Sequence, residues 1–273
     1  MDNATYQEMP CISSHWLKAM LDSPAACWRK YLDPHRSAPA PTDSLRLGTL
    51  VHGLALTPSQ FEREFFVADY ERRSHAGKAR YAALSATGLT VIKPAELEKA
   101  RAIVAALHAH PDAKRLLHGG KKERLILQPR LRGLLPLKAR LDIHQETRRE
   151  VVELKTTFDL QRFSASLERY RYPLSAAFYR DISQSRSVQF VVVQTREPYA
   201  VETFTMTREQ LQEGREQFTT ALQRFDACWL KNEWPETEPV TDLDDDPLMM
   251  PMPFMMATTS KQRLELPVGE LAL

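Results

Sequence analysis

The segment from Leu137 to Thr157, LKARLDIHQETRREVVELKTT, constrains the fold of this chain more than any other stretch. Two runs in which apolar and polar residues alternate, 137–143 and 151–155, flank the polar stretch 144–150. Side chains on a β-strand point alternately to the two faces of a sheet, so this pattern predicts a β-hairpin.

The hairpin places three charged side chains where a strand would normally be apolar. Glu153 and Lys155 share one face, Val152 and Leu154 take the face expected to pack on the core, and strand pairing brings Asp142 beside Glu153. Buried charges without partners are strongly destabilising, so the cluster needs an explanation. Spacing alone favours a simple one, an ion-pair cluster on a half-exposed hairpin, because the pattern is short and common.

A divalent cation is the second explanation. Magnesium prefers oxygen ligands, which Asp142, Glu153 and the backbone carbonyl of Leu154 would supply. Lys155 would then orient or activate a nucleophile and offset developing negative charge. This arrangement indicates phosphodiester hydrolysis.

The charge distribution is more informative than the net charge of +2. Between residues 114 and 149 the basic residues greatly outnumber the acidic ones, which favours a polyanionic substrate; a solvated charged face explains the pattern about equally well. The basic residues are Lys114, Arg115, Lys121, Lys122, Arg124, Arg130, Arg132, Lys138, Arg140, Arg148 and Arg149, against Glu123, Asp142 and Glu146.

Asp142, followed after ten residues by Glu153-Leu154-Lys155-Thr156-Thr157, resembles the active-site signature of the PD-(D/E)XK nuclease superfamily. From about Ile12 to Pro235 the chain resembles the exodeoxyribonuclease VIII (RecE-type) and lambda-type exonuclease branch, through ISSHWLKAMLDSPAACWRKYLD, LRLGTLVHGLAL, RYRYPLSAAFYRD and NEWP. Leu141 departs from the family, which usually has proline there. That position shapes the backbone and is not a ligand.

The resemblance implies an α/β fold of the restriction-endonuclease type, with a central mixed sheet flanked by helices. We expect a helical N-terminal cover over residues 1–43, a nuclease core over 44–235, and an acidic, Met/Pro-rich C-terminal tail over 236–273. The tail would either dock on a partner or pack on its own subunit.

Further metal-site residues follow from the resemblance. The expected helix Leu45–Leu56 carries His52, and the family's corresponding helix delivers a histidine to the metal, with Gly48 permitting close approach. A lone histidine on an apolar helix is more often a core residue, but the resemblance favours His52 as a ligand. Glu123 matches a glutamate that contributes to the metal environment in the family; an ion pair with a neighbouring lysine is the alternative.

Family members usually carry a Q-x-x-x-Y pair on a helix after the signature. Tyr179 keeps the tyrosine as an expected catalytic residue, whereas Ser175 replaces the glutamine, so a bridging water would have to make the missing contact. We expect DNA contacts from Arg29, Arg73, Lys78 and Arg140. For Arg29 an ordinary solvated helix face is the commoner explanation. Residues 72–80 have the composition of a surface loop leading into a helix.

The resemblance implies a magnesium-dependent exodeoxyribonuclease, with manganese as a substitute metal, that digests one strand of linear duplex DNA 5′ to 3′ from an end. It also implies a ring-shaped homo-oligomer, a role in annealing-type recombination, and a single-strand annealing protein as partner. The alternatives are a DNA-end-binding module with weakened catalysis and an endonuclease subunit of a repair or defence complex.

Three widely spaced cysteines, Cys11, Cys27 and Cys228, indicate a reducing compartment and no disulfide framework. They also leave too few thiolates for a four-cysteine iron–sulfur cluster. The sequence shows neither a membrane-spanning apolar run nor a signal peptide, so we expect a cytoplasmic protein without membrane contact.

Overall fold

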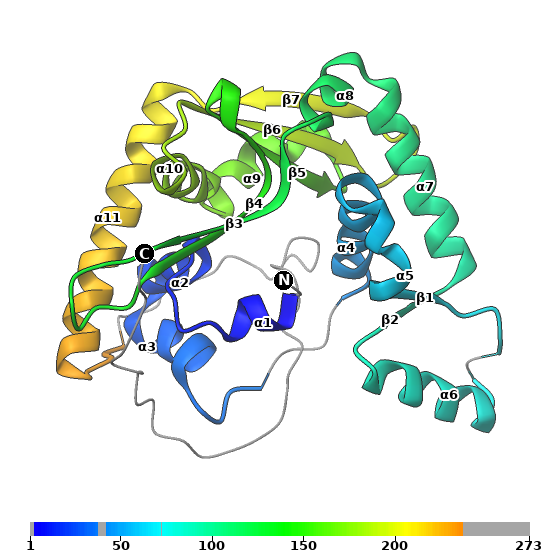
Figure 1. The fold of residues 1–273 in the computed structure, drawn as a ribbon, viewed down its shortest axis with the longest axis horizontal. Helices are drawn as coiled ribbons and strands as arrows, with labels where there is room; N and C mark the ends of the chain where they lie inside the picture. The colour runs from blue at the N-terminus through cyan, green and yellow to red at the C-terminus, as the bar shows by residue number, and fades with distance from the viewer. Residues whose placement is uncertain (1–2, 38–41, 72, 237–273) are drawn as a thin grey trace.

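A five-stranded mixed sheet forms the centre of the structure, a computed structural model that describes residues 3–37, 42–71 and 73–236 (Figure 1). Strands β5 and β6 run parallel, and all other neighbouring pairs run antiparallel. This architecture confirms the expected α/β fold, and the β4–β5 pair confirms the hairpin. The strands in their order across the sheet are β3 (Lys121–Gln128), β4 (Leu137–Gln145), β5 (Glu150–Thr157), β6 (Ser187–Gln194) and β7 (Val201–Thr205).

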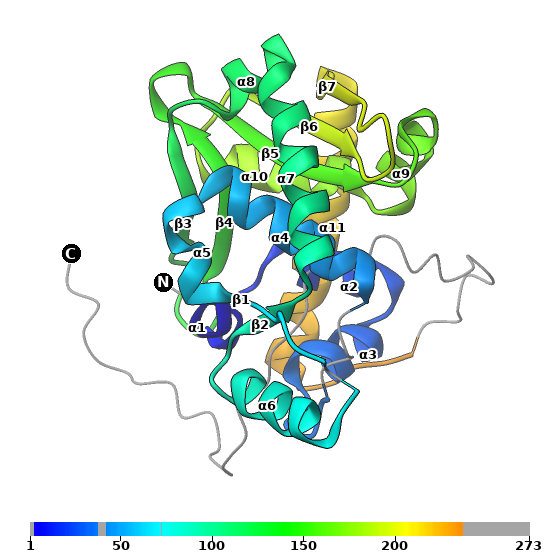
Figure 2. The same ribbon diagram turned by 90° about the vertical axis from the view of Figure 1, so that its right-hand side faces the viewer.

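Helices cover both faces of the sheet, and a separate hydrophobic core lies under each cover (Figures 1 and 2). The sheet is buried on both sides, which explains why the run 188–193 is continuously apolar apart from Gln189. One cover consists of α4 (Asp43–Leu56), α7 (Pro94–Ala109) and α8 (Pro111–Leu117). The other consists of α2 (Ser14–Asp22), α3 (Pro24–Cys27), α9 (Phe163–Arg169), α10 (Tyr172–Ile182) and α11 (Arg208–Lys231).

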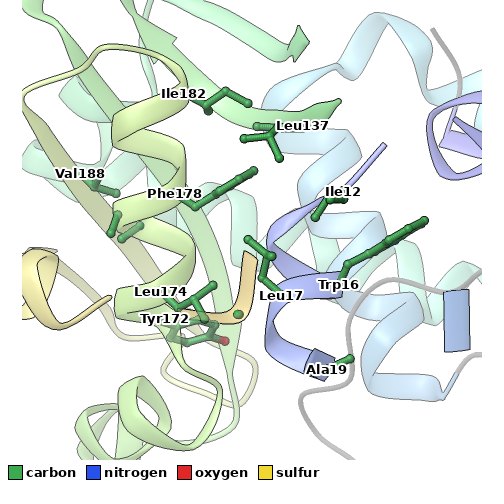
Figure 3. Packing of buried hydrophobic residues seen from close by; sticks show 14 of the residues in the cluster. Ile12, Trp16, Leu17, Ala19, Leu137, Tyr172, Leu174, Phe178, Ile182 and Val188 are labelled. Atoms are coloured by element: carbon green, nitrogen blue, oxygen red, sulfur yellow. The ribbon is translucent and has the colours of Figure 1, made fainter. Parts of the chain in front are cut away.

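The N-terminal helices belong to the second of these covers. Leu17 on α2 lies near Phe178 and Leu174 on α10, and all three side chains are buried in one core (Figure 3). Ile12, just before α2, forms an isolated parallel bridge with Leu137 at the start of β4. Residues 12–32 therefore share their core with the segment 44–235. This part of the chain also contains the π-helix η1 (Trp28–Leu32) and is preceded by α1 (Asn3–Glu8).

The alternation expected along β4 is broken at Asp142, which corrects the sequence-based pattern. Leu137, Ala139 and Leu141 enter one core, whereas Ile143 enters the opposite core. Residues two apart on a regular strand share a face, so the strand rotates between Leu141 and Ile143. The turn is also shorter than the predicted stretch 144–150.

The basic segment 73–80 leads from a loop into a helix, as its composition predicts. Ser74 accepts a hydrogen bond from the Gly77 backbone N–H and caps the helix, which starts at His75. This helix lies beyond a small parallel sheet, on the side of the molecule away from α8 and β7 (Figures 1 and 2). The elements concerned are β1 (Phe65–Val67), α6 (His75–Ala86) and β2 (Thr90–Ile92), preceded by η2 (Pro58–Gln60) and α5 (Phe61–Glu64).

Residues 237–273, which hold most of the predicted acidic and Met/Pro-rich tail, lie outside the described residues. Among the helices that are described, none combines the length and the apolar character that crossing a membrane requires.

Gly214 allows α11 to cross α10 in backbone contact. A Cβ atom at this position would lie 2.0 Å from the Pro173 carbonyl oxygen and 2.7 Å from the Leu174 nitrogen. We expect Gly214→Ala to lower the free energy of unfolding by about 3 kcal/mol, because one backbone must move away from the other. Urea denaturation would measure this change.

Gly48→Ala provides a matched control in another helix. Its Cβ would meet only the Thr156 hydroxyl, at 3.2 Å, and that side chain can rotate. Alanine also favours the helix by about 1 kcal/mol over glycine, so we expect little net change. Equal stability of the two variants would show that α10 and α11 are not packed as described.

Candidate metal centre

Asp142 and Glu153 lie where β4 and β5 separate. Regular pairing of the two strands ends at Ile143 and Val152. Beyond that point the backbone N–H groups bond to carboxylates of the opposite strand and not to its backbone carbonyls. The Leu154 N–H donates to Asp142 Oδ2 at 2.8 Å, and the Asp142 N–H donates to Glu153 Oε1 at 3.5 Å. The fork between the strands therefore holds two carboxylates with side-chain exposures of only 15% and 5%.

Glu123 approaches the same fork from the neighbouring strand. The register of β3 on β4 places it opposite Asp142, yet its φ of +48° interrupts the pairing there. A positive φ is unfavourable for a residue with a side chain, so the surrounding structure must hold it. Its partner is Arg140, whose Nε lies 3.0 Å from Glu123 Oε2, and not the neighbouring lysine considered as an alternative.

His52 reaches the fork from α4. Its Nδ1 lies 3.8 Å from Asp142 Oδ1, and the Leu154 carbonyl accepts a hydrogen bond from the ring. Burial, followed by the charge of Lys155, lowers the pKa of His52 to about 4, so the imidazole is neutral at physiological pH. A neutral ring can offer a nitrogen to a cation. Gly48, one turn earlier, brings α4 close to Thr156 on β5, as the sequence predicts.

Three of these side chains form a potential cation site. One ligand atom each from His52, Glu123 and Asp142 lie within 4.8 Å of one another, the single such group of three or more among the described residues. Burial and then the nearby Asp142 charge raise the pKa of both Glu123 and Glu153 to about 7, and burial raises the pKa of Asp142. The acidic groups repel one another, so this donor set fits a divalent cation that would neutralise it.

Lys155 lies on the Glu153 side of the fork. Its Nζ is 2.9 Å from Glu153 Oε2 and 4.0 Å from Asp142 Oδ2. Burial lowers the pKa of Lys155, but the two carboxylates outweigh it and hold this pKa above its ordinary value. The ammonium is therefore charged and is placed beside the cation site.

The observed cluster differs from the predicted ligand set at two residues, Glu123 and Glu153. Asp142, His52 and the Leu154 carbonyl meet as expected, and Glu123, expected in a supporting role, offers an oxygen directly. Glu153 instead contacts Lys155 and the Asp142 backbone, adjacent to the group of three.

Tyr179 and Ser175 lie on α10, and Ser175 is buried. The Tyr179 hydroxyl accepts a hydrogen bond from Ser14 Oγ at 3.2 Å, which links it to α2. Burial and then the charge of Glu153 raise the pKa of Tyr179, so its hydroxyl is near the carboxylates and is neutral.

Sequence reasoning missed two aromatic residues beside the fork. The Tyr172 ring centroid lies 5.9 Å from Lys155 Nζ and 5.3 Å from Lys18 Nζ. The Tyr6 ring centroid lies 4.9 Å from Arg140 Cζ. Tyr172 directly precedes the Pro173 that opens α10, a signal that could have placed it at the helix start; no local signal indicates Tyr6.

The four expected DNA contacts lie in different surroundings. Arg73 and Lys78 are exposed on the segment that contains α6. Arg29 is exposed on the N-terminal cover and forms an ion pair with Glu236. Arg140 is not on the outer surface, because it lies between Tyr6 and Glu123 within the fork.

The mixed sheet, its central hairpin and the acidic fork with its lysine define a fold and site of the PD-(D/E)XK type. A family model described as "PDDEXK-like domain of unknown function (DUF3799)" matches residues 13–240. The chain belongs to this family, which confirms the predicted superfamily.

Solved structures with the same fold include one named "putative exonuclease" from Eubacterium rectale. It has a TM-score of 0.60 and 13% sequence identity, and the similarity covers 87% of each chain. A phage-related exonuclease from Haemophilus somnus 129PT is similar at a TM-score of 0.38 and 11% identity, over 82% of this chain and 96% of that one. No curated protein matches the chain.

Proposed function

We propose that this protein is a divalent-metal-dependent deoxyribonuclease that digests one strand of linear duplex DNA from an end. The observation that carries the proposal is the fork itself. His52, Glu123 and Asp142 converge within 4.8 Å, and the charged Lys155 lies 4.0 Å from Asp142. A cation site beside a fixed ammonium suits phosphodiester hydrolysis, because both groups stabilise the negative charge that develops on the phosphate.

Each residue of the fork has a distinct task in this proposal. His52, Glu123 and Asp142 would hold the cation, with the Leu154 carbonyl and Glu153 beside them. When bound, magnesium, or manganese in its place, supplies the Lewis acidity that polarises the phosphodiester.

Lys155 and Tyr179 complete the proposed catalytic group. The Lys155 ammonium would orient the attacking water and offset the negative charge that develops on the phosphate. The neutral Tyr179 hydroxyl would donate a hydrogen bond to the water or the phosphate, and a bridging water would replace the contact that Ser175 is too short to make.

The exonuclease specificity rests on resemblance. The motifs of the chain resemble the RecE-type and lambda-type branch, and a structural neighbour is named as an exonuclease. We therefore propose 5′ to 3′ polarity, a ring-shaped homo-oligomer around the DNA, and a single-strand annealing protein that receives the product for recombination.

Positive side chains would guide the duplex towards the fork. Arg73 and Lys78 are exposed and would contact backbone phosphates, and Arg29 would do so from the N-terminal cover. Arg140 would act next to the reacting phosphate, because it lies beside Glu123.

One observation favours a second function, a DNA-end-binding module with weakened catalysis. Ser175 stands where the resembled family usually has a glutamine, and its short side chain is buried in α10. Such a module would keep the fork and bind DNA ends while cutting slowly.

End-labelled linear duplex and covalently closed circular DNA, each incubated with the protein and magnesium, test the proposal. We expect the linear substrate to be degraded only when magnesium is present and the circle to stay intact, because digestion starts at an end. Cleavage of the circular DNA would show that the protein is an endonuclease and not an exonuclease. Binding of linear DNA without cleavage would favour the end-binding module.

A further inference from the structure

Lys138 is a fully buried lysine that forms no ion pair with a carboxylate of the described residues. Its exposed fraction is 1%, and its Nζ donates to the backbone carbonyls of Tyr6, Gln7 and Met9 at 2.6, 3.3 and 2.9 Å. An ammonium has three donors, so the N-terminal segment satisfies all of them. These carbonyls lie at the C-terminal end of α1, where the helix dipole favours a positive charge.

Burial lowers the pKa of Lys138 to about 8, so the side chain is still protonated at neutral pH. A buried charge of this kind is not an efficient source of stability, because its desolvation opposes its hydrogen bonds. We therefore look for the role of Lys138 in the residues that it positions.

The Tyr6 ring contacts both Lys138 and Arg140. The Tyr6 ring centroid lies 4.6 Å from Lys138 Nζ and 4.9 Å from Arg140 Cζ, and the ring is buried. Contact with a cation over an aromatic face is attractive, more so when water is excluded. The ring thus restrains Arg140 on one side.

Arg140 carries this restraint to the cation site. Its Nε contacts Glu123 Oε2 at 3.0 Å, and Glu123 is one of the three groups that converge there. Glu123 also has the unfavourable φ of +48°, so an external partner is needed to keep its carboxylate in place. The contacts form a continuous series from Lys138 through Tyr6 and Arg140 to Glu123.

We propose that Lys138 is a positioning residue for the metal centre: by holding α1, it presses the Tyr6 ring on Arg140 and so orients Glu123 for the cation. The N-terminal segment is then a wall of the site and not only a cover. The inference rests on the proposed function for the identity of the ligand, a divalent cation.

Calorimetric titration of the metal-free protein with Mn²⁺ tests this role. Lys138→Met keeps the side-chain volume but removes the three hydrogen-bond donors. We expect the dissociation constant for Mn²⁺ to rise about tenfold, a typical effect of losing a residue that supports a metal ligand. Lys122→Met is the matched control. Lys122 also precedes Glu123 and donates to a carbonyl at a helix end, but that carbonyl belongs to Leu117 on α8 and not to α1. We expect its affinity to equal that of the unsubstituted protein.

Tyr6 variants separate positioning from folding. Tyr6→Leu leaves the backbone carbonyls for Lys138 in place, and we expect the same tenfold loss of Mn²⁺ affinity. Tyr6→Phe keeps the aromatic ring, so we expect its Mn²⁺ affinity to equal that of the unsubstituted protein. Unchanged affinity in Tyr6→Leu, or an equal loss in Tyr6→Phe and Lys122→Met, would overturn the inference. Failure of the unsubstituted protein to bind Mn²⁺ would instead contradict the proposed function.

Discussion

Asp142→Asn should abolish magnesium-dependent DNA cleavage, with a fall in rate of about a thousandfold or more. The Asp142 carboxylate has three neighbours in the fork: His52 lies 3.8 Å away, Lys155 lies 4.0 Å away, and the Leu154 N–H donates to it. An asparagine oxygen can still accept the Leu154 N–H, so the fork should keep its shape. The substitution removes the charge that a cation needs, and single-turnover kinetics would measure the loss.

The same substitution should stabilise the metal-free protein. Burial and then the charge of Asp142 raise the pKa of Glu123 and Glu153 to about 7, above the ordinary value of a glutamate. A carboxyl whose pKa is higher in the folded state destabilises the fold at pH values above its unfolded pKa. Without Asp142 this repulsion weakens, so we expect the free energy of unfolding in EDTA to rise by about 1 kcal/mol at pH 8.

Asp226→Asn is the matched control for both measurements. Asp226 forms a half-buried ion pair with Arg130, whose Nη1 donates to it at 2.8 Å, far along the chain from the fork. Its loss should lower stability, because Arg130 is left without its carboxylate, and should leave cleavage unchanged. If Asp142→Asn behaved like Asp226→Asn, Asp142 would be an ordinary structural carboxylate.

Lys155→Met is expected to reduce the cleavage rate by a similar factor, about a thousandfold, while leaving metal binding intact. The ammonium is held charged by Glu153 and Asp142, and methionine cannot orient water or offset charge on a phosphate. Because Lys155 competes with a cation for the same carboxylates, its removal should keep or increase Mn²⁺ affinity. The loss should therefore lie in kcat at saturating DNA and not in the KM for the metal.

Lys121→Met controls for the loss of a lysine–glutamate pair. Lys121 contacts Glu146 at 2.8 Å, the same type of contact as Lys155 with Glu153, but on the exposed surface. We expect full cleavage activity from this variant. Substantial activity in Lys155→Met would remove the lysine from the proposed mechanism.

Much of the fold could be predicted from the sequence, because local signals specify it. The alternation around residues 137–157 predicts the hairpin, which the structure contains. Other local signals coincide with observed helix starts: a capping box opens α11 at Thr207, and Pro94 and Pro173 stand in the first turns of α7 and α10. In each case neighbouring residues carry the information.

The details of the metal centre depend on distant contacts and could be predicted only in part. Asp142, His52 and Lys155 were expected from a motif, and the structure places them together. The closer approach of Glu123 depends on its positive φ and on Arg140, and the rotation of β4 at Asp142 changes which face each side chain takes. Period-two alternation cannot anticipate such a break.

The N-terminal segment shows the same limit of local reasoning. Lys138 occupies a polar position of the alternating strand and was counted among the basic residues expected to favour a polyanion. Its 1% exposure and three carbonyl partners follow from α1, which lies about 130 residues earlier in the chain. No pattern near residue 138 indicates that partner.

Anomalous diffraction from crystals soaked in Mn²⁺ tests most directly whether the fork binds a cation. We predict one anomalous peak within coordination distance, about 2.2 Å, of a His52 nitrogen and of oxygens from Glu123 and Asp142. An Mn²⁺ peak elsewhere on the protein, with no metal at His52, Glu123 and Asp142, would contradict the account.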